Sequence, residues 1–183
     1  MPVKQLPKYG TLSLFQASEP ITEFGTPELY ALIEDMRDTM IAANGIGIAA
    51  PQIGVNKRVI MLGYDHNPRY PNMKPLPFMI LINPEIEILD DTQIFMWEGC
   101  LSVPGLRGKV PRYKKVKYKG WDPEGNPLEG ILEDFHARVM QHEVDHINGK
   151  LYPLHIIDMH DFGFEEVVLE RAIEENQMVI LSK

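Results

Sequence analysis

The sequence has little of three features that would narrow its class at once: cysteine, positive charge and long apolar segments. Its single cysteine, Cys100, excludes an internal disulfide. No uninterrupted apolar segment approaches the ~20 residues that a membrane-spanning helix needs, so we expect no membrane contact. Lys and Arg number 18 against 26 Asp and Glu, which gives a formal net charge of −8. This excess of negative charge argues against an extended DNA-binding surface.

What remains is the composition of an ordinary globular protein. A chain of 183 residues fits one domain, which we expect to span residues 1–183 and to bury a core without cross-links. Residues 1–7 have neither the apolar core of a signal peptide nor the Arg and Ser bias of a transit peptide. We therefore expect a cytoplasmic protein.

Hydrophobic periodicity predicts helices separated by series of strands. One helix follows Thr26-Pro27, residue types that cap and open a helix, and reaches about residue 43. Another begins at Asp134, which can act as its cap, and ends near residue 148, where Gly149 suits a left-handed stop. Further segments predict an amphipathic helix at residues 164–178, strands at 58–62, 78–82, 85–89, 93–97 and 128–132, and an exposed loop at 63–77.

One local run departs from the acidic average. It contains seven basic residues, namely Arg107, Lys109, Arg112, Lys114, Lys115, Lys117 and Lys119. Val116 and Tyr118 alternate with three of these lysines, a pattern typical of a strand with one solvated face. The functional alternative is transient contact with a ribosome or another anionic surface.

The strongest local motif is His142-Glu143-Val144-Asp145-His146, inside the helix predicted from residue 134. Residues i and i+4 share a helix face, so both imidazoles can reach one metal ion. Glu143 can then face a water beside the metal. The same stripe carries Phe135 and Val139, which favours a buried site over two histidines on a solvated face. Strands in series with few helices predict an α+β fold, with antiparallel β-sheets packed around this central buried helix carrying the HExxH motif.

The third metal ligand cannot be read from spacing. A metzincin would place a histidine where Tyr152 stands. A thermolysin-like site would take a downstream glutamate, and Glu165 or Glu166 lies at a suitable separation along the chain. Cys100 is the other candidate, although an isolated cysteine is more often a small buried apolar residue.

Three segments together resemble the peptide deformylases. Gly45-Ile46-Gly47-Ile48-Ala49-Ala50-Pro51-Gln52, Glu98-Gly99-Cys100-Leu101-Ser102 and the HExxH segment match the first, second and third motifs of that family, in the same order. The resemblance implies hydrolysis of the N-formyl group from the N-terminal formylmethionine of nascent polypeptides, with release of formate. It also implies one divalent metal ion per chain, held by Cys100, His142 and His146. Ferrous iron is expected, while zinc, nickel and cobalt suit the same donors.

The resemblance also assigns roles to neighbouring residues. Glu143 would accept and return the proton, while the backbone N–H of Leu101 and the side-chain amide of Gln52 would stabilise the developing oxyanion. Substrate would bind along Gly45, Ile46 and Gly47 and at Gly99, and the first methionine would enter an apolar pocket, for whose walls Met96, Phe135, Val139 and the ring of His142 are the candidates. Without the resemblance, the glycines read as a tight turn and the apolar residues as core. We expect Glu98 and Asp145 to be structural carboxylates, paired with Arg112 or Arg138.

Two other functions fit parts of this pattern. A metalloprotease with two histidines and a glutamate would not need Cys100. An inactive relative would bind formylated or acetylated N-termini without cleaving them, but such a protein has no need for a general base at Glu143.

Overall fold

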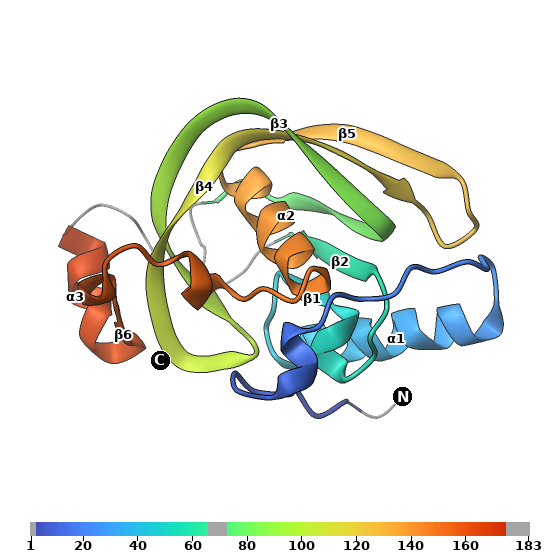
Figure 1. Cartoon of the computed structure of the whole chain (residues 1–183), viewed down its shortest axis with the longest axis horizontal. Coiled ribbons are helices and arrows are strands. Elements are labelled where there is room, and N and C mark those ends of the chain that lie inside the picture. The colour runs from blue at the N-terminus through green and yellow to red at the C-terminus, as the bar shows by residue number, and fades with distance from the viewer. Residues whose placement is uncertain (1–2, 66–72, 175–183) are drawn as a thin grey trace.

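The strands form a single, strongly curved sheet. The computed structural model describes residues 3–65 and 73–174, and within these ranges all strand pairs are antiparallel. The sheet order is β1-β2-β3-β4-β5, with β6 added alongside β4 (Figure 1). The prediction of a mixed fold with antiparallel strands is confirmed, but one sheet replaces the separate sheets expected. The strands are β1 Gly47–Ala49, β2 Val59–Tyr64, β3 Leu76–Cys100, β4 Val103–Trp121, β5 Pro127–Glu133 and β6 Phe162–Phe164.

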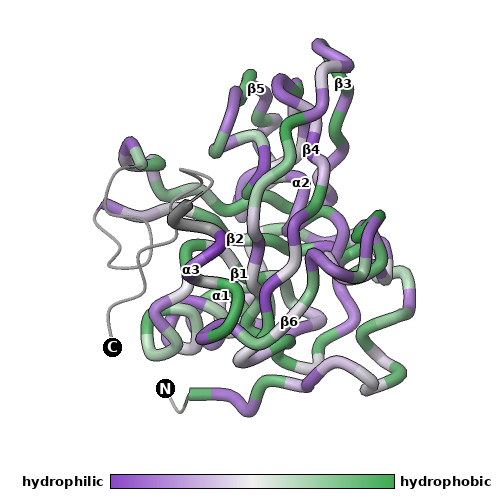
Figure 2. Tube along the Cα trace, turned by 90° about the vertical axis from the view of Figure 1, so that its left-hand side faces the viewer, coloured by the Kyte–Doolittle hydropathy of each residue, from purple (hydrophilic) through white to green (hydrophobic). Residues whose placement is uncertain are grey.

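Strand β3 merges three strands that the sequence predicts separately. Its pairing with β4 shifts register between Ile82 and Glu85 and on both sides of Asp90. These places coincide with the gaps between the predicted strands, where Asn83, Pro84, Asp90 and Asp91 stand. A β-bulge admits such residues and bends the strand without ending it, so the chain continues and the sheet curves. Figure 2 shows β3, β4 and β5 extending together as an arm, with hydrophilic and hydrophobic stretches along them.

Helix α1, Pro27–Ala42, begins as predicted. The Thr26 hydroxyl accepts a hydrogen bond from the Leu29 N–H at 3.2 Å, which satisfies one of the free donors at the helix start. Helix α3 spans Glu165–Glu174; the predicted extension over residues 175–178 lies outside the described residues. The chain also forms 3₁₀ helices η1 Leu12–Phe15, η2 Ala50–Ile53, η3 Tyr152–His155 and η4 Met159–Asp161.

Helix α2, Asp134–Ile147, carries the HExxH segment and is capped differently from the prediction. Glu133 occupies the N-cap position without a side-chain cap hydrogen bond, and Asp134 has a positive φ of 51°. The reason is that β5 runs straight into α2, so the chain turns at Asp134 itself. At the other end Gly149 adopts φ 71°, the left-handed stop that the sequence predicts.

The two faces of β2 explain how α1 and α2 are positioned. Val59 and Met61 belong to the cluster that α1 buries, whereas Ile60 and Leu62 belong to the cluster around α2. Alternate residues of a strand point to opposite faces, and both faces of β2 are covered, so the strand is apolar throughout. In Figure 1, α2 lies within the curve of the sheet. Within the described ranges, none of the helices has the length and apolar character needed to cross a bilayer.

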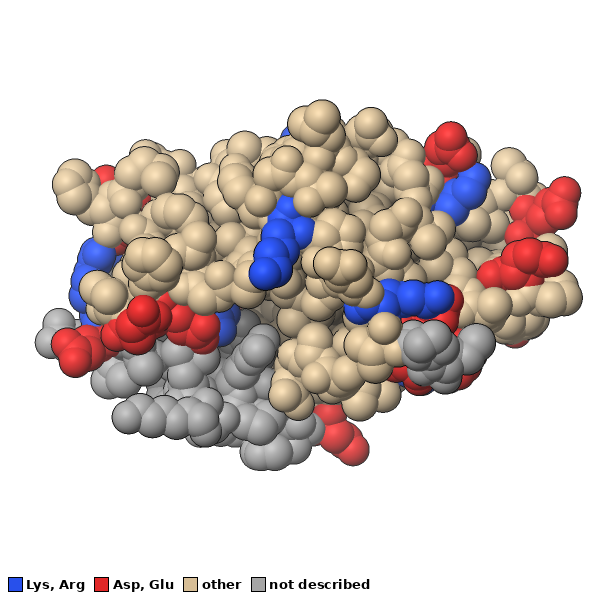
Figure 3. Space-filling model, turned by 90° about the horizontal axis from the view of Figure 1, so that it is seen from below, with Lys and Arg blue, Asp and Glu red and all other residues tan. Residues whose placement is uncertain are grey.

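The basic run lies on β4 and is matched by acids. Val116 is buried, while Lys115 pairs with Glu133 at 2.7 Å and Lys117 pairs with Glu129 at 2.9 Å across to β5. These ion pairs support the interpretation of a strand with one solvated face. In the view of Figure 3, Lys and Arg side chains lie apart from one another, and some of them adjoin Asp or Glu. Of the loop predicted at residues 63–77, residues 66–72 lie outside the described residues.

Candidate metal centre

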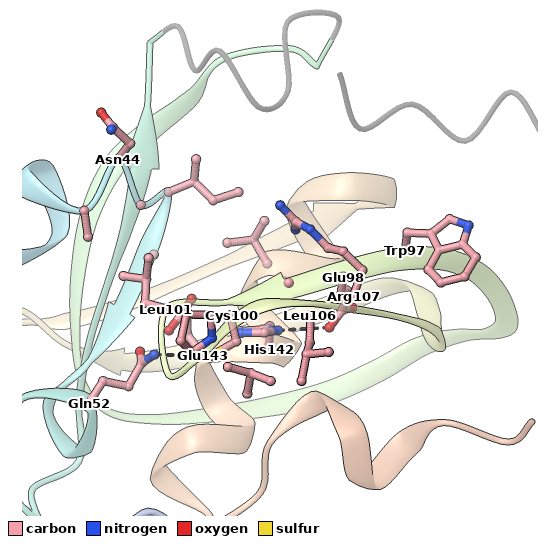
Figure 4. Close-up of a pocket in the computed structure, with 18 of the residues that line it drawn as sticks. Asn44, Gln52, Trp97, Glu98, Cys100, Leu101, Leu106, Arg107, His142 and Glu143 are labelled. Atoms are coloured by element: carbon pink, nitrogen blue, oxygen red, sulfur yellow. Dashed lines mark hydrogen bonds and ion pairs between the residues drawn. The ribbon is translucent and has the colours of Figure 1, made fainter. Parts of the chain in front are cut away.

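A tight hairpin places Cys100 at the site. Cys100 is the last residue of β3, Leu101 and Ser102 form the turn, and Val103 pairs back with Cys100. The register between β3 and β4 shifts between Glu98 and Cys100, and such bulges redirect side chains beside functional sites. Figure 4 shows Cys100, Leu101, His142, Glu143 and Gln52 gathered in one region.

Three candidate ligands from two distant segments meet at this point. One ligand atom each from Cys100, His142 and His146 lies within 4.8 Å of the others. The Cys100 Sγ is 3.3 Å from the His146 Nε2, and the two imidazole rings are 5.0 Å apart between centroids. The structure therefore brings the helical pair and the cysteine together. Glu165 instead pairs with Arg107 at 2.8 Å, and Glu166 is exposed.

The charges around Cys100 favour its thiolate. Burial raises the pKa of the thiol, but the imidazoles of His146 and His142 outweigh this effect and bring the pKa to about 5. A thiolate beside two ring nitrogens is a donor set that suits a divalent transition metal, because ligands must be deprotonated to bind. Among the described residues, the buried Nδ1 of His146 has no hydrogen-bond partner.

Glu98 orients His142 from the side opposite the sulfur. Its Oε2 is 2.9 Å from the His142 Nδ1, which leaves Nε2 free to bind a metal. Arg112 donates to both carboxylate oxygens at 2.9 and 3.0 Å, and Arg138 donates to Oε1 at 2.6 Å. Burial alone would raise the pKa of Glu98, but Arg112 and His142 hold it well below its usual value. The buried charge is thus compensated on several sides.

Arg112 extends this network to Asp145. Its Nη1 donates to the Asp145 Oδ2 at 2.5 Å, and the His155 Nε2 lies 2.8 Å from the same oxygen. Both expected carboxylates are therefore paired, Glu98 with Arg112 and Arg138, and Asp145 with Arg112. The arginine cross-links the β3 end and helix α2, which carry the candidate ligands.

The side chain of Glu143 is buried close to the candidate ligands. Only 4% of the residue is exposed, and its Oε2 has no hydrogen-bond partner among the described residues. Burial raises the pKa of this carboxyl to about 7. A Cβ at Gly47 would lie 2.3 Å from the Glu143 Oε1. Gly47 therefore leaves the space that this carboxylate occupies.

The side chain of Gln52 has a defined orientation. Its Oε1 accepts from the Ala49 N–H at 2.9 Å, and its Nε2 lies 3.4 Å from the Cys100 Sγ and 3.3 Å from the Ser102 Oγ. Because the oxygen is engaged by a backbone donor, the amide N–H groups point toward the cysteine.

A cavity of about 290 Å³ opens beside these residues. It is lined by six of the seven residues predicted to bind substrate, namely Gly45, Ile46, Gly47, Gly99, Phe135 and Val139. Met96 is the exception and requires a correction, because it lines a separate cavity of about 30 Å³ with Ile94 and Tyr113. Its neighbour Trp97 lines the main cavity. Trp97 is followed by Glu98, Gly99 and Cys100, which line the same cavity, so this lining begins one residue beyond Met96 along β3.

Comparison of this chain with known proteins shows which family it is similar to. The model of the polypeptide deformylase family matches residues 3–161. Peptide deformylase 2 of Ralstonia nicotianae is 52% identical over 91% of this chain and 94% of that protein. The Met-Ala-Ser-bound structure of a class I type b peptide deformylase from Acinetobacter baumannii superposes with a TM-score of 0.82 at 39% identity, covering 85% of this chain and 99% of that one.

The chain belongs to the peptide deformylase family. It is accordingly a metal-dependent hydrolase that removes the N-formyl group from N-terminal formylmethionine. Peptide deformylase 1 of Nitrosomonas europaea is also similar, at 48% identity over 91% of this chain and 94% of that protein. An actinonin-bound peptide deformylase structure from Synechococcus elongatus matches with a TM-score of 0.77 at 31% identity, covering 98% of this chain and 89% of that chain.

Several residues of this deformylase cavity escape prediction from the sequence. Trp97, Leu106, Arg107 and Glu165 line it alongside the predicted residues. Arg107 belongs to the basic run, and Glu165 opens the last described helix, so neither carries a local pattern that indicates a cavity. Only the pairing of β6 with β4 brings them together.

Proposed function

We propose that Cys100, His142 and His146 hold one divalent metal ion and that Glu143 transfers the proton during hydrolysis of the N-formyl group. The observation that carries this proposal is the convergence of the cysteine with the helical histidines within 4.8 Å. Ferrous iron is the ion we expect, and zinc, nickel and cobalt suit the same sulfur and nitrogen donors. When bound, such an ion supplies Lewis-acid activation of water and of the formyl oxygen.

Glu143 has the properties of a proton carrier in this reaction. Its buried carboxyl, with a pKa raised to about 7, can accept a proton from water and return it to the leaving amine near neutral pH. Its Oε2, which has no hydrogen-bond partner among the residues that the structure describes, supports this role, because it is available to a water molecule or to substrate. The free amine and formate are then the products.

The oxyanion formed during attack needs donors that are already in place. We assign this role to the Gln52 amide, which is oriented by the Ala49 N–H, and to the backbone N–H of Leu101 in the hairpin turn. Loss of one such donor commonly costs ~10²–10³ in rate.

The edge of the sheet offers a place for the peptide backbone. β1 is the terminal strand in the sheet order, so an extended peptide can add beside Gly45, Ile46 and Gly47. The first methionine would then enter the cavity near Phe135 and Val139. A relative that binds Met-Ala-Ser supports a peptide of this kind as ligand. Nascent chains begin in the cytosol, and we place the reaction there; contact with the ribosome stays a prediction.

Formate release from formyl-Met-Ala-Ser tests this function, using anaerobically purified protein with its metal counted. We expect turnover by the wild-type chain with one metal ion bound. Glu143→Gln should keep the metal and lose ~10²–10⁴ in turnover, whereas Cys100→Ser should lose or weaken metal binding.

Each variant tests a different part of the proposal. Normal turnover by Glu143→Gln would remove the proton-transfer role. Full metal content and activity in Cys100→Ser would remove the thiolate ligand and revive the two-histidine protease, for which internal peptide cleavage is the matching assay. Binding of formyl-Met-Ala-Ser by wild type without formate release would indicate an inactive relative.

A further inference from the structure

The segment that follows the metal-binding helix returns to the cavity. Strand β6 pairs with β4 through Leu106 opposite Phe164 and Arg107 opposite Gly163. Glu165 begins α3 immediately after this strand and lines the cavity. Figure 1 shows β6 and α3 beside the lower part of β4. The C-terminal part of the described chain thus contributes a carboxylate to a cavity that is otherwise lined by Leu6, residues 43–47, Gln52, Leu101 and residues of β3, β4 and α2.

Arg107 is held between this carboxylate and the backbone next to Cys100. Its Nη2 donates to the Glu165 Oε1 at 2.8 Å, with 6% of the arginine side chain and 27% of the glutamate side chain exposed. A Cβ at Gly99 would lie 2.1 Å from the Arg107 Nη1, so the guanidinium lies directly against Gly99. Figure 4 shows Arg107 near Glu98 and Leu106.

Further contacts keep α3 in this place. The guanidinium of Arg171 lies over the Trp97 ring, 5.5 Å from its centroid. The same side chain donates to the Asp161 Oδ1 at 2.7 Å and to the His160 carbonyl at 2.6 Å. Val168 is buried against Gly163. Glu165 is therefore fixed at the cavity and does not lie on a free segment.

The Glu and Arg residues that line the cavity differ in what their side chains contact. Glu98 and Arg138 bind each other in the buried network behind His142, and Glu143 lies against Gly47. Arg107 and Glu165 form the remaining pair of charged lining residues. Of this pair, Glu165 presents the more exposed side chain, at 27% against 6% for Arg107.

We infer that Glu165 is a specificity-determining residue that disfavours peptides with a carboxylate close behind the first methionine. Its carboxylate engages the guanidinium of Arg107, which is the cationic group in the cavity best placed to bind an acidic side chain. It also repels such a side chain directly. The inference rests on the proposed function, in which the cavity binds the start of a formylmethionyl peptide.

Isosteric peptides isolate this effect. The measured quantity is the rate of formate release from peptides that differ only by Asp against Asn. At the second position, formyl-Met-Asp-Ala-amide is compared with formyl-Met-Asn-Ala-amide; at the third, formyl-Met-Ala-Asp-amide is compared with formyl-Met-Ala-Asn-amide. Both comparisons are made on metal-loaded wild-type protein and on metal-loaded Glu165→Gln. We expect the wild type to prefer Asn at one or both positions by about threefold to fivefold, the range of a partly exposed charge pair, mainly through KM. Glu165→Gln should reduce this ratio toward one or reverse it. Glu166→Gln removes the same charge from the exposed neighbour and should keep the wild-type ratio.

Two further measurements make the outcome decisive. Raising the ionic strength from about 0.01 M to about 1 M should shrink the wild-type preference, because charge interactions are screened; this needs no variant. Calorimetric binding of the deformylated peptides should give the same Asn-to-Asp ratios without turnover. An unchanged ratio in Glu165→Gln at both positions, or an equal change in Glu166→Gln, would overturn the inference. Absence of formate release would defeat the proposed function, while peptide binding would still decide the role of Glu165.

Discussion

Gly47 and Glu143 show how a single missing side chain shapes the site. The space where Gly47 would carry a Cβ is taken by the Glu143 carboxylate, at 2.3 Å from the ideal Cβ position. Ordinary Cβ contacts are never this short, so any larger residue at position 47 must displace the glutamate or the strand. Gly45 differs, because its Cβ would lie 3.1 Å from the Leu101 Cδ1 and the Met40 Cγ and 3.4 Å from the Gly47 carbonyl oxygen, so these neighbours need to shift by only a few tenths of an ångström.

Gly47→Ala should therefore impair catalysis more than metal binding. We expect a fall of about 10²-fold in kcat/KM for formyl-Met-Ala-Ser, because an ~1 Å displacement of a catalytic group can cost that much. Metal content per chain should stay at the wild-type value. Gly45→Ala is the matched comparison and should lose less activity. Wild-type turnover in Gly47→Ala would show that Glu143 need not occupy its observed position.

Helix α2 docks on β4 through a polar contact as well as apolar ones. The pairing of β4 with β5 ends at Lys115 opposite Glu133. Two residues earlier in β4, at Tyr113, the side chain of Gln141 binds the strand in place of β5. Its Oε1 accepts from the Tyr113 N–H at 3.0 Å, and its Nε2 donates to the Tyr113 carbonyl at 2.9 Å. One amide thus satisfies both backbone groups of Tyr113 on that edge and sets the position of the helix along the strand.

Gln141→Met should destabilise the protein by leaving these backbone groups without partners. Leaving buried polar groups unpaired costs about 1–3 kcal/mol, which urea unfolding of the metal-loaded protein can measure. Lys114→Met, at an exposed position on the same strand, should change the free energy of unfolding by less than about 0.5 kcal/mol. Equal stabilities for the two variants would mean that the Gln141 contact adds nothing to docking.

At the scale of the whole molecule, the candidate metal centre joins two parts of the chain that are far apart in sequence. Cys100 ends β3, and the histidines lie 42 and 46 residues later on α2. Arg112 adds a second link, since it binds Glu98 on β3 and Asp145 on α2. A metal ion that binds these residues only in the folded state stabilises that state, by an amount set by the metal concentration relative to Kd.

Removal of the metal should lower the melting temperature without unfolding the protein, because the buried clusters on both sides of β2 persist. At a metal concentration about 1,000 times Kd, the loss is about 4 kcal/mol in the free energy of unfolding. Calorimetric melting of metal-loaded and metal-free protein measures this difference. The difference should be smaller in Cys100→Ser, and an equal difference in both proteins would argue against the cysteine as a ligand.

The sequence by itself determined the features that depend on local periodicity and backbone chemistry. The Thr26 cap, the Gly149 stop, the helix containing the HExxH segment and the strands on both sides of residue 122 all follow from nearest neighbours and spacing. Three motifs in order also indicated the family. Each motif spans a few positions, so a local pattern is enough to find it, although the individual roles of Gln52, Leu101 and Glu143 stay predictions.

The tertiary structure decided what depends on direction and on pairing between distant segments. Bulges near Pro84 and Asp90 let β3 continue where the sequence predicted separate strands. The folded chain placed Trp97 in the main cavity and Met96 in a separate one. The return of β6 to β4 joined Glu165 to Arg107, and the hairpin after Cys100 carried the thiol to the histidines. Contacts of this kind cannot be read from local spacing, because their free energy arises between residues that are neighbours only after folding.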